Sequence, residues 1–184
     1  MRIYLIDETY DRYDDEAEAS RRYKSRLEAE LSMELEERNI GAGADLPSFL
    51  AQIDVGPLLA VVTLFFLGTP INENLDAWPK IFSKFKSFLK YPIRTDGTAA
   101  AIIAIQRVFE ELGGLPRSVV LKKYWATSPR SETSFPIDVS EFGIGDEPNE
   151  EELGDVVHNF VIVAENLTFQ VSVIGNRVDL IKCE

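Results

Sequence analysis

A group of carboxylates close to the N-terminus is the first place where this sequence could do chemistry. The candidate metal ligands are Asp7, Glu8 and Asp11. They follow a short β-type run, residues 2–6, and α/β folds tend to place ligands at strand ends. Two or three carboxylate oxygens there could hold Mg²⁺ for phosphoryl transfer or hydrolysis. We favour a solvated helix start matched to the helix dipole, because no distant carboxylate is identifiable as a further ligand.

The single histidine and the single cysteine are the other candidates for catalysis. A general-base His158 would need a nucleophile and an orienting carboxylate close in space. Asp155 is near in sequence, but a strand would place it on the opposite face from His158. Cys183 lies next to the C-terminal residue, where preorganised sites are rare. We therefore expect a structural or surface histidine, no intrachain disulfide and no catalytic residue in the chain.

The charge balance excludes several classes of partner. The chain of 184 residues has 19 lysines and arginines against 31 aspartates and glutamates, a net charge of −12. Such a chain is not expected to bind nucleic acid or an anionic membrane, since both depend on clustered cations. Residues 58–67, the longest apolar run, are about half the length of a membrane helix, and the N-terminal residues lack a signal-peptide core. We expect a cytoplasmic protein.

A long acidic segment separates the last part of the chain from the rest. Residues 127–155 contain three prolines, three glycines and eight carboxylates between Asp138 and Asp155. Irregular connections of this length are uncommon in compact domains and are often functional. We expect this acidic segment to bind a partner protein, which its charge predicts to be basic. The carboxylates assigned to that binding are Asp146, Glu147, Glu150, Glu151 and Glu152.

Although the net charge of the chain is negative, several lysines form a candidate basic patch. They are Lys80, Lys84, Lys90, Lys122 and Lys123. One interpretation is a surface for an anionic partner or for the molecule's own acidic segment. The interpretation that we favour is a solvated helix face opposite a phenylalanine-rich core side.

The first two thirds of the chain predict alternating strands and helices. Apolar residues that recur every three or four positions indicate helices, and short continuous apolar runs indicate buried strands. A cap at Asp96 or Thr98 and the glycines at 113 and 114 bound one of the helices. We expect strands at 2–6, 58–67 and 118–125, and helices at 13–38, from about 72 to 90, and at 99–112.

The last 29 residues predict a three-stranded antiparallel meander. Three alternating runs, residues 156–164, 167–174 and 177–183, are separated by two-residue turns. The predicted fold is therefore a single α+β domain over residues 1–184. Its mixed sheet ends in the meander, and about three helices pack on it; parallel crossovers in the first half are allowed by this order.

The leading functional hypothesis is a non-catalytic intracellular interaction module with an acidic surface. An immunity- or antitoxin-like inhibitor of a basic protein is its most specific form. One alternative is a carboxylate-based, metal-assisted enzyme with Asp7 and Glu8 at its site. Another is a sensor domain that binds a small ligand. No cofactor is expected except Mg²⁺ in the enzyme alternative, and the oligomeric state stays open.

Overall fold

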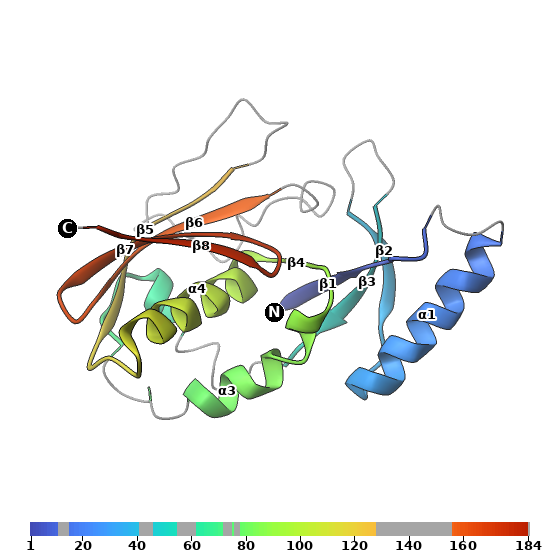
Figure 1. Ribbon diagram of the computed structural model, residues 1–184, viewed down its shortest axis with the longest axis horizontal. Coiled ribbons are helices and arrows are strands. Elements are labelled where there is room, and N and C mark those ends of the chain that lie inside the picture. The colour runs from blue at the N-terminus through green and yellow to red at the C-terminus, as the bar shows by residue number, and fades with distance from the viewer. Residues whose placement is uncertain are drawn as a thin grey trace.

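The computed structural model shows two antiparallel sheets with helices packed against them (Figure 1). It describes residues 1–10, 15–40, 46–54, 62–71, 75, 78–127 and 156–183.

Sheet A has four strands in the order β2-β3-β1-β4. Its strands are β1 (Arg2–Ile6), β2 (Glu36–Asn39), β3 (Pro47–Gln52) and β4 (Ile93–Thr95). β1 lies between β3 and β4 and runs antiparallel to both. All four residues of the outer strand β2, EERN, are exposed, and charged side chains of this kind protect an edge strand from further pairing.

Sheet B has four strands in the order β5-β6-β7-β8, which is also their order in the sequence. Its strands are β5 (Val119–Thr127), β6 (Val157–Ala164), β7 (Leu167–Ile174) and β8 (Arg177–Cys183). All neighbours are antiparallel. On β7 the side chains alternate, so that Phe169, Val171 and Val173 are buried while their neighbours are half-buried or exposed.

The helices differ strongly in how they are covered. α1 (Glu16–Leu31) lies on the outer side of sheet A, whereas α4 (Gly97–Leu112) lies against sheet B (Figure 1). α3 (Trp78–Phe85) and the 3₁₀ turn η2 (Phe88–Lys90) lie beside α4. The Asp96 carboxylate begins α4 by accepting a hydrogen bond from the Ala99 amide.

One apolar core extends from sheet A through α4 to sheet B. The turn between β7 and β8 fastens the two sheets together. Gly175 in this turn has a positive φ of 58°, and a Cβ there would lie 2.0 Å from the Ile93 carbonyl oxygen. The neighbouring Asn176 side chain donates a hydrogen bond to the Tyr91 carbonyl at 3.1 Å. Only glycine fits at this contact, because both the φ angle and the close approach exclude a side chain.

The α+β class, the C-terminal meander and the helix over residues 99–112 are confirmed. The strand predicted at 118–125 is β5. Every strand pair among the described residues is antiparallel, and the strands form two sheets. The strand-then-helix pieces of the first half therefore do not produce parallel neighbours in this part of the structure.

The strand predicted at 58–67 is wrong for its described part, because residues 62–66 are helical. Val62, Phe65 and Phe66 are buried, whereas Leu64 is exposed. A spacing of three and four between buried residues is that of one helix face. The run is apolar except for Thr63, so its periodicity could not distinguish a strand from a helix.

The helix predicted at 13–38 is too long. It ends at Leu31, because Ser32 adopts the left-handed conformation with φ 53°, and β2 then begins at Glu36. The helix predicted to continue to residue 90 ends at Phe85 and is followed by η2. The following segment also contains β4, a strand of three residues that the sequence analysis did not predict.

Candidate functional site

Asp7, the first predicted metal ligand, builds the turn that follows β1. Its carboxylate is buried and accepts hydrogen bonds from the Thr9 amide at 2.9 Å and the Thr9 hydroxyl at 2.6 Å. The Asp7 amide donates to the Pro47 carbonyl and so continues the pairing of β1 with β3. This carboxylate has a structural use that needs no metal, since an aspartate often bonds the backbone two residues on in such turns.

Glu8, the second predicted ligand, faces α1. Its carboxylate accepts a hydrogen bond from the Tyr23 hydroxyl at 3.0 Å. Burial, together with the neighbouring Glu8 carboxylate, raises the pKa of Tyr23 well above its usual value. Tyr23 therefore stays protonated and holds the turn against the helix. Asp11, the third predicted ligand, lies outside the described residues.

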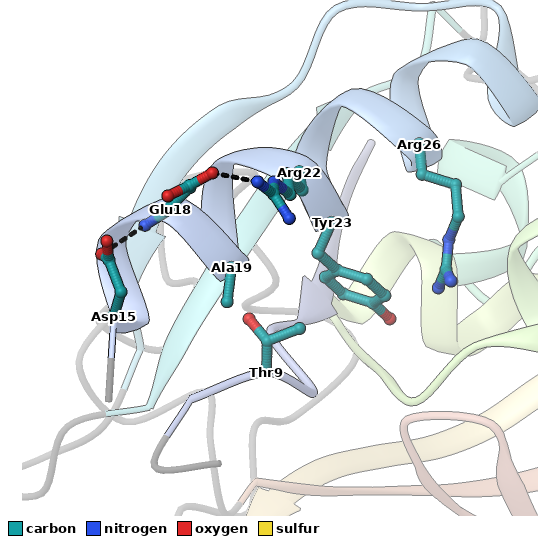
Figure 2. Close-up of a pocket in the computed structure, with 7 residues that line it drawn as sticks. All are labelled: Thr9, Asp15, Glu18, Ala19, Arg22, Tyr23 and Arg26. Atoms are coloured by element: carbon teal, nitrogen blue, oxygen red, sulfur yellow. Dashed lines mark hydrogen bonds and ion pairs between the residues drawn. The ribbon is translucent and has the colours of Figure 1, made fainter. Parts of the chain in front are cut away.

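A pocket of about 540 Å³ lies between this turn and α1. Figure 2 shows Thr9 facing Ala19 and Tyr23, with Arg26 on the same side of the helix. The Arg26 guanidinium carbon lies 4.9 Å from the centre of the Tyr23 ring, while Arg22 pairs with Glu18 on the rim. Asp15 caps the helix by accepting from the Glu18 amide. The polar side chains of the pocket are thus engaged with one another or with neighbouring groups such as Asp7 and Glu8. The described residues contain no group of three metal-ligating side chains.

His158 is the centre of a buried polar contact between the sheets. Its Nδ1 lies 2.9 Å from the Tyr124 hydroxyl, and its Nε2 lies 3.1 Å from the Thr95 carbonyl oxygen. A carbonyl oxygen can only accept, so Nε2–H donates to Thr95, and in the neutral ring that burial favours Nδ1 accepts from the Tyr124 hydroxyl. Burial lowers the pKa of His158 to about 4. The structural interpretation of His158 holds, and the surface interpretation is wrong.

Asp96 is a second buried polar residue at the same junction. Besides capping α4, its carboxylate accepts a hydrogen bond from the Arg2 amide at 2.6 Å. Burial raises the pKa of the Asp96 carboxyl, and these amide hydrogen bonds act against that shift. The sequence indicated the cap, but it gave no signal for the contact with Arg2, which is 94 residues away.

The predicted basic patch is divided between two parts of the molecule. Lys90 is exposed on η2, and α3 contains Lys80 and Lys84, whose side chains are outside the description. Lys122 and Lys123 are exposed on β5, where the pairing shifts between Leu121 and Lys123. The residue next to them, Tyr124, is buried against the start of α4, so Lys123 lies on the opposite face of sheet B from α4.

The same face of sheet B places one aromatic residue beside a lysine. The Lys123 ammonium lies 5.1 Å from the centre of the Trp125 ring, a distance typical of a cation–π contact. Of the two aromatic residues on this strand, Tyr124 is core and Trp125 is half-buried on the outer face.

The carboxylates predicted to bind a partner lie outside the described residues, namely Asp146, Glu147, Glu150, Glu151 and Glu152. The structure does describe where the acidic segment is anchored. β5 extends to Thr127, which lies directly opposite Val157, the first residue of β6. The segment thus joins two paired strand ends of sheet B.

Comparison with protein-family models, with curated proteins and with solved structures gave no match. Among the described helices, none has the length and apolar character needed to cross a membrane.

Proposed function

We propose that this protein is a non-catalytic intracellular interaction module whose acidic segment binds a basic partner protein. The observation that carries the proposal is the place of the acidic segment in the fold. Neighbouring strands lie about 5 Å apart, and Thr127 and Val157 are opposite each other. A turn of about two residues could join such strands. Residues 128–155 are therefore not needed to complete the pairing of sheet B.

The charge of the segment supports the same proposal. Residues 128–155 contain nine carboxylates and one arginine, which is a net charge of −8 out of −12 for the whole chain. Charge concentrated in this way speeds encounter with an oppositely charged protein and selects against wrong partners. An inhibitor of a basic enzyme, comparable to an immunity protein or antitoxin, is the most specific form of the proposal, and the cytoplasm is the compartment we propose.

The carboxylate-based enzyme is the weaker proposal. Asp7 and Glu8 each accept a hydrogen bond from a neighbouring hydroxyl, and Asp7 also accepts from a backbone amide. A metal ion at these oxygens would compete with the contacts that hold the turn in place. Nothing in the described part of the structure favours this function over partner binding.

The proposal is tested by neutralising the acidic segment. In the test variant, five carboxylates become the corresponding amides, at Asp146, Glu147, Glu150, Glu151 and Glu152. A matched control neutralises five exposed carboxylates of the described surface, at Glu16, Glu34, Glu36, Glu37 and Asp179. We expect the unaltered chain to co-purify from its own cells with a stoichiometric basic protein that is lost at high salt.

The two variants then distinguish the effect of the segment's own charges on binding from the effect of the net charge of the chain. Both variants lose five negative charges, so the affinity of a partner that responds only to net charge would fall equally for both. We expect the test variant to bind the purified partner at least tenfold more weakly and the control to stay within about threefold, with a smaller salt dependence for the test variant. Binding that is equal for both variants, or unchanged by salt, would contradict the proposal.

A further inference from the structure

We propose that the groove between α3 and the C-terminal half of α4 binds an acidic peptide segment of a partner protein, anchored by apolar side chains. This groove has a volume of about 840 Å³. It lies apart from the acidic segment's anchors and would take a ligand of the opposite charge, so it is a second interaction surface.

The floor of the groove is aromatic and already ordered. The rings of Trp78 and Phe109 are 5.4 Å apart at 67°, an edge-to-face contact. The Trp78 indole N–H donates to Gln106 at 2.9 Å, and the Gln106 amide donates to Glu110 at 3.0 Å. The two contacts of Trp78 tie α3 to α4, and the Gln106–Glu110 bond fixes the Gln106 side chain within α4. Because the floor is held in place without a ligand, little ordering is needed when a peptide binds.

The upper part of the groove exposes apolar surface. Leu115 is 42% exposed, and Phe82 and Leu89, which also line the groove, are half-buried. A Cβ added at Gly114 would meet nothing within 4 Å, so the space above this wall is open. A cleft of this size with a mostly apolar lining falls within the range of ligand-binding pockets, roughly 300–1,000 Å³.

The charges around the groove determine the kind of peptide. Lys86 and Lys90 line it and are exposed, and neither forms an ion pair with a carboxylate in the described part of the chain. Residues 77–95 contain five lysines and arginines and no acidic residue. Glu110, the one carboxylate in the lining, is bonded to Gln106 and lies 3.6 Å from Arg107. The groove therefore favours carboxylates beside the apolar anchors of its ligand.

The test selects peptides from a random 12-residue display library with the full chain as the target. Two variants of the full chain then measure where the selected peptides bind. G114W adds a large side chain to the lining of the groove, at a position whose φ lies outside the left-handed region and whose surroundings are open. K86E/K90E reverses the two charges of the lining, and K122E/K182E makes the same charge change at exposed positions on sheet B.

We expect the selected peptides to combine an aromatic or large aliphatic pair with at least two carboxylates. Their affinity should fall at least tenfold for both G114W and K86E/K90E and stay within about twofold for K122E/K182E. The proposal is overturned if no peptide is selected, if the peptides are basic, or if G114W binds them normally. Binding that becomes much tighter after neutralisation of the acidic segment, but not after neutralisation of the five surface carboxylates of the control variant, would show that the chain's own segment fills the groove, and would overturn a partner as the occupant.

Discussion

α1 and α4 are built alike and are covered very differently. Each has 16 residues, an aspartate cap at its start and a left-handed residue at its end. Yet α1 buries two residues, Tyr23 and Leu27, whereas α4 buries ten. Helix length and caps therefore do not determine how much a helix contributes to the fold. The apolar content of the sequence does, because burial of apolar area is the main favourable term.

α4 belongs to the framework of the fold, whereas α1 is mainly a surface helix. α4 packs on β6, β7 and β8 and also contacts β1 and β4, so it joins the two sheets. α1 contacts the core through a narrow stripe, and much of its circumference carries charged side chains such as the Arg22–Glu18 pair. Exposed pairs of this kind contribute little to stability.

The largest expected effect is a truncation in α4. Ile102 is fully buried, and we expect Ile102→Ala to lower the free energy of unfolding by about 4 kcal/mol. Leu31, at the end of α1, is half-buried, and Leu31→Ala should cost about 1 kcal/mol because less apolar area is lost. Urea unfolding of both variants at pH 7 measures the difference. Equal losses would show that the two helices support the fold alike.

A slightly smaller effect is expected from the buried junction beside α4. Burial lowers the pKa of His158 to about 4 in the folded chain, below the value of about 6.5 for a free histidine. The unfolded chain therefore binds a proton more readily, and stability is lost as the pH falls from about 6.5 to about 4. This amounts to about 3 kcal/mol. Asp96 acts in the opposite direction, because its raised pKa favours the folded chain as the pH falls.

The variant His158→Gln isolates the histidine. Asp96 and the surface carboxylates titrate in both proteins, so the difference between the two pH profiles reports His158 alone. We expect the unaltered chain to lose more stability than the variant between pH 7 and pH 4. Parallel profiles in urea unfolding would mean that His158 is not held neutral in the folded protein.

The smallest expected effect compares the two aspartate caps. Asp15 accepts one amide hydrogen bond on the surface, and Asp15→Ala should cost about 1 kcal/mol. Asp96 accepts from the Ala99 and Arg2 amides in a buried place. Asp96→Ala leaves buried donors without a partner and should cost about 2 kcal/mol. Thermal unfolding at pH 7 ranks the two, and a larger loss for Asp15→Ala would reverse the comparison.

The sequence predicted the parts of the fold whose signals are local. The meander follows from alternation and two-residue turns, and α4 follows from an apolar run between Asp96 and Gly113. The errors occurred where local signals were ambiguous. Residues 62–66 are apolar except for Thr63, so no polar face marks them as a helix. β2 contains no apolar residue, and only its pairing with β3 makes it a strand.

The candidate sites show the same limit of prediction from local sequence signals. The sequence shows Asp7 and Glu8 as a cluster, but their partners Thr9 and Tyr23 are fixed by the turn and by the position of α1. The contact of His158 with Thr95 spans 63 residues and exists only because the two sheets meet. The bond between Trp78 and Gln106 in the groove likewise joins two helices, and spacing along the chain could not reveal either contact.

The central claim is that the acidic segment serves binding and not folding. The most direct measurement replaces residues 128–155 with an Asn-Gly turn and determines both the thermal midpoint and the affinity for the basic partner. We predict a midpoint close to that of the unaltered chain, since β5 and β6 remain paired, together with at least a hundredfold loss of affinity. A shortened chain that fails to fold, or that still binds the partner, would contradict the claim.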